Sequence, residues 1–192
     1  MHKNAIAMVL AASALLGLGM AATGDDYTID SMHSGVTFKI SHSDLNWIHG
    51  RFNQFSGEFA IDSSDPGKSS FTMVIKPESI DTNNAARDGH LRSADFFDTK
   101  KYRDMKFTST SVRPIEGGLE VTGDFTLHGE TKPVTFNLMG GKMIAAKGKG
   151  GQRTGYTAEF KLKRSDFGIS KGVPMLGDDV WVTVSFQGIK KR

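Results

Sequence analysis

Residues 36–41 read Val-Thr-Phe-Lys-Ile-Ser, so apolar and polar side chains alternate strictly. A period of two indicates a β-strand with one buried face and one solvated face. The same alternation recurs along most of the chain, in residues 55–61, 71–75, 105–107, 119–127, 134–138, 156–162 and 180–186. About eight or nine strands of this kind are enough to close a barrel. The sequence therefore predicts an all-β fold.

A polar segment between Asp81 and Asp98 breaks this rhythm. It opens with Asp81-Thr82, two good helix-capping residues, so we expect one or two short helices near residues 82–98. Gly89 should cause a break there, because glycine weakens a continuous helix. The Gly- and Lys-rich stretch 140–155 is expected to be a solvated hairpin connection. A phosphate-cradling loop is the alternative, but no strand-to-helix context follows it.

The N-terminal residues indicate export. Lys3 precedes the uncharged stretch 5–16, and small residues follow up to Ala21, where we expect a signal peptide to be cleaved. Residues 22–192 then fit a single domain with no transmembrane segment. The chain has no cysteine, so sheet hydrogen bonds and apolar packing must hold this domain together. Removal of Lys3 with the signal lowers the formal net charge from +3 to about +2, which is too small to imply nucleic acid or an anionic membrane surface as a partner.

The aromatic composition points to the barrel interior. The chain has 13 Phe but 2 Trp and 3 Tyr, and most Phe side chains fall on the inward-facing positions. A barrel of this size is either filled by its own side chains or holds a small ligand. Gly57, Gly123 and Ala158 interrupt the bulky rows and favour a cavity, unless the glycines mark bulges or bends.

A lining of Phe and Met suits a flexible hydrocarbon such as a prenyl or acyl chain, because apolar attraction is non-directional. The expected wall consists of Phe38, Ile40, Phe59, Phe71, Met73, Phe107, Phe125, Phe136, Phe160 and Val182.

Residues 87–92 form the sharpest polar cluster, beside Phe96 and Phe97, and this segment is expected to cover the barrel mouth. Arg87, His90 and Arg92 would then meet a polar or phosphorylated head group, while Leu91, Phe96 and Phe97 meet the tail. The alternative is that Arg87 pairs with Asp88 to fix the helix against the sheet.

Catalytic motifs are missing from the sequence. It contains no Gly-x-Ser-x-Gly, no Cys nucleophile and no His-Glu-x-x-His, and the spacing of His33 and His42 matches no zinc pattern. We therefore expect a binding or carrier protein with no metal and no cofactor other than a bound lipid. Two alternatives stay open: a lipid- or quinone-linked enzyme using His90 and Asp88 as acid and base, and a filled-barrel protein-interaction module.

Several motifs resemble one known family, the YceI-like polyisoprenoid-binding proteins of the periplasm. The likeness covers nearly the whole chain after the signal peptide. It is carried by residues 30–34 (DSMHS), 36–42 (VTFKISH), 50–57 (GRFNQFSG), 79–82 (SIDT), 87–97 (RDGHLRSADFF), 102–109, 123–134 (GDFTLHGETKPV) and 164–169 (RSDFGI).

The resemblance implies an extended, lipocalin-like, eight-stranded antiparallel barrel. Its interior would hold a polyprenyl phosphate, a ubiquinone-like lipid or another long-chain amphiphile, and the protein would be periplasmic. The sequence departs from the family at Arg103, where the family usually has proline. No ligand contact is expected at this position. A homodimer formed through edge strands is left open.

Overall fold

The computed structural model describes residues 24–145 and 151–192. The predicted signal peptide at residues 1–21 lies outside the described residues. So does the middle of the predicted connection between residues 140 and 155.

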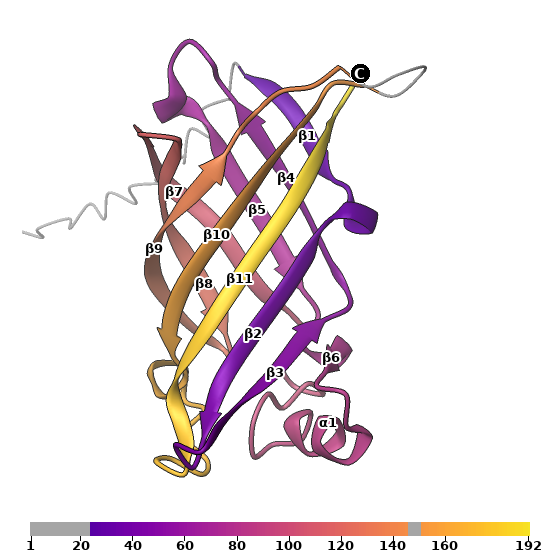
Figure 1. Ribbon diagram of the computed structural model, residues 1–192, viewed down its shortest axis with the longest axis vertical. Coiled ribbons are helices and arrows are strands. Elements are labelled where there is room, and N and C mark those ends of the chain that lie inside the picture. The colour runs from indigo at the N-terminus through magenta and orange to yellow at the C-terminus, as the bar shows by residue number, and fades with distance from the viewer. Residues whose placement is uncertain (1–23, 146–150) are drawn as a thin grey trace, which may run out of the picture.

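The protein is an elongated antiparallel β-barrel, seen from the side in Figure 1. Its closed ring has the order β1-β4-β5-β7-β8-β9-β10-β11, and β11 pairs back onto β1. The predicted eight-stranded antiparallel barrel is therefore confirmed. The strands are β1 (Asp25–Ile29), β2 (Gly35–His42), β3 (Asn46–Phe52), β4 (Phe55–Ile61), β5 (Ser70–Ile75), β6 (Ile80–Asp81), β7 (Met105–Ile115), β8 (Gly118–Leu127), β9 (Glu130–Gly140), β10 (Arg153–Lys163) and β11 (Leu176–Lys190).

The long strand β11 organises both ends of the barrel. Its C-terminal part pairs with β1 and its N-terminal part pairs with β2, so β2 continues the row that β1 begins. The short helix η1 (Ser31–His33) separates β1 from β2, and Asp30 caps it by accepting from the backbone N–H of Met32. Beyond β2, the sheet continues with β3, which pairs with β2, and with β6, which pairs with β3.

The helix α1 (Ala85–Leu91) lies beside β6 at the end of the barrel opposite the C-terminus (Figure 1). The predicted helical segment is thus confirmed, but its details differ. Asn84, not Asp81-Thr82, caps the helix by accepting from the N–H of Arg87, and the helix continues through Gly89 without a break. Three further 3₁₀ helices are η2 (Pro66–Lys68), η3 (Pro77–Ser79) and η4 (Arg164–Phe167).

The interior is packed differently at the two ends. At the C-terminal end, the rings of Tyr27, Phe59 and Phe71 stack, with centroids 4.9 and 5.7 Å apart, and Tyr156 and Phe186 meet Phe59 edge-on. This cluster closes that end of the barrel. A second core cluster near α1 joins side chains of the barrel wall to the helical segment, including Phe52, Ile80, Phe96, Met105 and Phe167.

The glycines do not create the hollow interior that the sequence suggested. A Cβ at Gly57 would overlap the carbonyl oxygen of Thr72, and one at Gly123 would overlap that of Thr108 and the ring of Phe107. Both positions are glycine because neighbouring atoms already occupy the space, so this prediction was wrong. The alternative fits better for Gly123, which pairs with Ser109 next to a register shift in the β7–β8 ladder.

Candidate ligand-binding cavity

A cavity of about 770 Å³ runs through the barrel between the aromatic cluster and the end that carries α1. Its size falls within the range of roughly 300–1,000 Å³ typical of small-molecule sites. The wall is predominantly aliphatic and aromatic. The barrel is therefore not completely filled by its own side chains, which argues against the filled-barrel alternative.

The structure brings the predicted lining residues together, with one exception. The cavity is lined by Phe38, Ile40, Phe59, Phe71, Met73, Arg87, His90, Phe96, Phe97, Phe107, Phe125, Phe136, Phe160 and Val182. Ala158, the third small residue, also faces it. These residues come from most strands of the ring and from the helical segment.

One wall of the cavity is a row of three phenylalanines from β7, β9 and β10. Phe107 and Phe136 have ring centroids 5.1 Å apart, and Phe136 and Phe160 are stacked at 4.8 Å with an interplanar angle of 17°. Such contacts stabilise the rings beyond their buried area, which keeps this wall in place without a ligand.

Arg87 lines the cavity from α1, but it does not pair with Asp88. Its Nε donates to the hydroxyl of Thr82 at 2.7 Å and its Nη2 to the Thr82 carbonyl at 2.6 Å. Asp88 is buried and accepts from the Thr82 backbone N–H at 2.9 Å and from the Thr82 hydroxyl. The predicted direct pair is therefore wrong, and both side chains fix the helix through Thr82.

His90 also lines the cavity, and its partner is Asp95. The His90 Nε2 and an Asp95 carboxylate oxygen are 3.0 Å apart, and Lys171 lies 3.7 Å from the other oxygen. The hydrogen bond with His90, followed by the Lys171 charge, holds the pKa of Asp95 below its ordinary value. Because His90 bonds Asp95 while Asp88 bonds Thr82, the acid–base pair of the enzyme alternative is not formed.

Arg92 does not line the cavity, contrary to its predicted head-group role. Its Nε donates to the carbonyl of Glu78 at 2.8 Å and its Nη2 to that of Ile80 at 2.9 Å. The side chain therefore ties the end of α1 to η3 and β6. Proximity to Arg87 and His90 in the sequence did not reveal this, because the side-chain direction rotates by about 100° with each residue of an α-helix.

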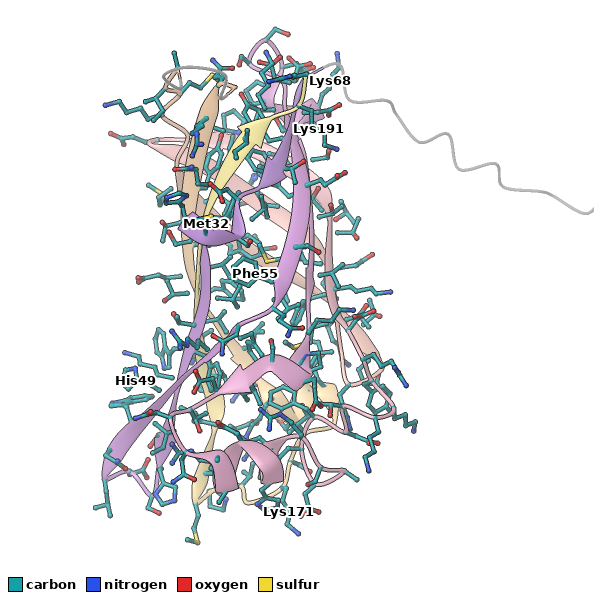
Figure 2. All side chains as sticks on the ribbon, turned by 90° about the vertical axis from the view of Figure 1, so that its right-hand side faces the viewer. Met32, His49, Phe55, Lys68, Lys171 and Lys191 are labelled. Atoms are coloured by element: carbon teal, nitrogen blue, oxygen red, sulfur yellow. The ribbon has the colours of Figure 1, made fainter. Side chains whose placement is uncertain are left out.

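The sequence reasoning missed the polar and flexible residues around the open end. His42 and Asn46 reach the cavity from the β2–β3 hairpin, and Lys171 and Met175 reach it from the connection between η4 and β11. We call this end the mouth. Figure 2 shows Lys171 at this end of the barrel.

A buried arginine holds the mouth together. Arg164 in η4 donates from Nε to the carbonyl of Gly177, from Nη1 to that of Ile169 and from Nη2 to that of Leu176, at 2.8 to 2.9 Å. Burial lowers the pKa of this guanidinium. His33 lies on η1, and its Nδ1 is 2.7 Å from a carboxylate oxygen of Asp30. Within residues 24–145 and 151–192, no group of three His, Cys, Asp or Glu side chains could hold a metal ion.

The model of the YceI-like domain matches residues 27–188. The chain belongs to the YceI-like family. The predicted resemblance is thereby confirmed, and the match spans nearly all of the described barrel.

Individual YceI-like relatives agree with this assignment. The UPF0312 protein of Ectopseudomonas mendocina is 41% identical over 197 residues, covering 100% of both chains. The crystal structure of the YCEI protein of Campylobacter jejuni is 30% identical, with a TM-score of 0.71 over 80% of this chain and 91% of that chain. A polyisoprenoid binding domain from Saccharophagus degradans shares the fold at 18% identity, with a TM-score of 0.61 over 86% of this chain and 98% of that one.

Proposed function

We propose that the protein is a periplasmic carrier that holds one long-chain isoprenoid lipid, such as a polyprenyl phosphate or a ubiquinone-like molecule, in the barrel. Membership of the YceI-like family supports a barrel binding protein, and the fold is shared with a domain described as polyisoprenoid-binding. The observation that carries the proposal is the elongated apolar cavity of about 770 Å³ with an open end.

The cavity chemistry selects a hydrocarbon tail. Its wall contacts a ligand mainly through aromatic rings and aliphatic groups, so binding scales with the number of buried carbons. Each buried CH₂ contributes about 0.8 kcal/mol, so ten carbons contribute roughly 8 kcal/mol before the costs of association are subtracted. The branched aliphatic units of an isoprenoid would pack against the Phe107, Phe136 and Phe160 row.

The polar residues at the mouth suit a head group. Arg87 uses Nε and Nη2 to hold Thr82, and no hydrogen bond within the described residues engages its Nη1. His90 and Lys171 lie on the same side of the cavity entrance. We place a phosphate or a quinone carbonyl here, where charge-assisted donors meet solvent. Arg92 is not part of this head-group site, because its Nε and Nη2 hold the carbonyls of Glu78 and Ile80.

The family and its polyisoprenoid-binding neighbour suggest a binding protein rather than an enzyme. An enzyme would change its ligand, whereas a carrier returns it unchanged. Incubation with a prenyl lipid, followed by extraction and mass analysis, separates the two classes.

The experiment that tests the proposal is native mass spectrometry of the protein purified from its own periplasm without detergent. Organic extraction would then identify the bound species. We expect one isoprenoid per chain. A protein that is empty and also refuses added prenyl lipids would overturn the proposal.

A further inference from the structure

The mouth of the barrel carries exposed apolar side chains on two adjacent loops. Leu45, at the β2–β3 turn, is 85% exposed, and Met175, before β11, is 68% exposed. The backbone N–H of Ser43 donates to the carbonyl of Met175 at 2.6 Å, so the two loops are joined. We call Leu45, Val173 and Met175 the tip. All three are large apolar residues that face solvent.

The tip is continuous with the cavity. Met175 is both exposed and part of the cavity lining, and Leu176 follows it on the inside. An apolar chain that leaves the cavity would therefore pass along Met175 to reach the tip. Apolar surface placed where a lipid enters favours contact with the phase in which that lipid dissolves.

A belt of tryptophan and lysine lies on the outer face of the barrel behind the tip. The belt consists of Trp47 on β3, Lys39 on β2, Trp181 on β11 and Lys161 on β10. The Lys39 ammonium lies 5.0 Å from the ring centroid of Trp47 and 5.8 Å from that of Trp181, and Lys161 lies 5.6 Å from Trp181. Both tryptophans are nearly half exposed, at 47% and 45%.

The charge of the belt fits a phosphate-bearing surface. Lys161 pairs with Asp179 at 2.7 Å, but Lys39 has no carboxylate partner among the described residues. Its charge is held between two ring faces and remains available to an anion outside the barrel. Tryptophan rings flanked by lysines are typical of the zone where a bilayer meets water.

The spacing of tip and belt matches the depth of a membrane-surface contact. Lys39 is three residues before His42, the last residue of β2, or about 10 Å along the strand, and the turn that carries Leu45 follows directly. Peripheral elements insert roughly 5–10 Å into the boundary between head groups and acyl chains. A tip immersed to this depth would place the belt at the level of the lipid phosphates.

We propose that the protein docks on a phospholipid bilayer with its mouth down, the tip inserted and the belt at the head groups. This inference rests on the proposed function, since it explains how a lipid enters the cavity without crossing water. None of the helices in the described part of the chain has the length and apolar character needed to span a bilayer.

The first test uses the full chain without its signal peptide and vesicles of phosphatidylethanolamine and phosphatidylglycerol. Both tryptophans of the protein lie in the belt, so their fluorescence reports on docking directly. We expect a blue shift and co-flotation with the vesicles, both weakened by salt. Absence of the shift and of flotation would overturn the proposal. Binding to native membranes but not to pure-lipid vesicles would also overturn it, in favour of a protein partner.

Two matched substitutions locate the contact. Leu45→Ser removes an apolar side chain from the tip, and Met32→Ser removes one that is equally exposed, at 87%, on η1 away from the mouth (Figure 2). We expect Leu45→Ser to lower the vesicle partition coefficient about tenfold and Met32→Ser to leave it unchanged. Lys39→Gln should lower it about fivefold. Equal effects of Leu45→Ser and Met32→Ser would contradict mouth-down docking.

A second measurement separates this inference from the proposed function. Leu45 does not line the cavity, so Leu45→Ser should bind a water-dispersed prenyl alcohol as the unsubstituted protein does. In the unsubstituted protein, prenyl binding without vesicle binding would overturn the docking alone. Vesicle binding without prenyl binding would support the docking and overturn the carrier function.

Discussion

Replacing Arg164 with lysine should destabilise the barrel despite preserving the charge. The side chain is 6% exposed and its three nitrogens reach three different carbonyls, those of Gly177, Ile169 and Leu176. A planar guanidinium spreads its donors in a fixed fork, whereas a lysine ammonium is a single point. Lysine can keep one of these hydrogen bonds and leaves two carbonyls without a donor.

The cost follows from the two lost hydrogen bonds. A hydrogen bond to a charged group contributes about 1.5–3 kcal/mol. We use the lower figure, because the bonds to Gly177 and Leu176 are only partly buried and water can replace some of the lost donors. The free energy of unfolding should therefore fall by about 3 kcal/mol. For a domain of this size that corresponds to a drop of roughly 6–12 °C in Tm.

Urea unfolding followed by circular dichroism measures this change. The matched control is Arg113→Lys, because Arg113 pairs with Glu120 on the outer surface and its side chain is 69% exposed. An exposed pair contributes less than about 1 kcal/mol, so the control should unfold almost like the original protein. A loss below about 1 kcal/mol for Arg164→Lys would refute the claim that the three-carbonyl contact holds the mouth together.

Three further predictions concern the cavity, the wall and the pH response. Phe160→Asp should abolish uptake of a fluorescent prenyl lipid, because the substitution places an unpaired carboxylate in the apolar wall. The control Thr157→Asp, on the outer face of β10, should retain the uptake. Uptake by a folded Phe160→Asp protein would contradict this lining. Gly123→Ala should lower the free energy of unfolding, measured in urea, by about 1–3 kcal/mol, because the added Cβ overlaps the Thr108 carbonyl. An unchanged midpoint of urea unfolding would show that the wall can shift to accept the methyl group. The hydrogen bond with His33 lowers the pKa of Asp30, so this carboxylate stabilises the fold above roughly pH 4 and the benefit is lost as the pH falls through the lowered pKa. Asp30→Asn should therefore lower Tm at neutral pH but not in strong acid, and a Tm difference independent of pH would refute this assignment.

The sequence could predict the barrel wall because strand alternation is a local property. In residues 36–40 of β2 and 156–162 of β10, the inward residues are aliphatic or aromatic and the outward residues are polar or charged, and the cavity accordingly lies beside Phe38 and Phe160. The short helix was predicted for a similar reason, since a polar segment without alternation cannot continue the sheet. Its cap was misplaced because Thr82, a good capping residue by type, instead bonds Arg87 and Asp88.

The glycines show where local reasoning fails. Gly123 was interpreted as empty space, but whether a missing side chain leaves a void depends on what lies across the strand. Here the ring of Phe107 and the Thr108 carbonyl fill it. The roles of Arg87 and Arg92 diverged for the same reason. Both are arginines in one helical segment, and only the positions of distant backbone carbonyls determine which of them faces the cavity.

By itself, the sequence determined the all-β class, the strand faces, the apolar character of the interior and the family. These depend on periodicity and composition, which neighbours along the chain decide. The tertiary structure alone decided which end of the barrel is closed, how three carbonyls gather around Arg164, and how Lys39 comes to lie between Trp47 and Trp181. Those features join residues from different strands, and their distances exist only once the barrel has closed on itself.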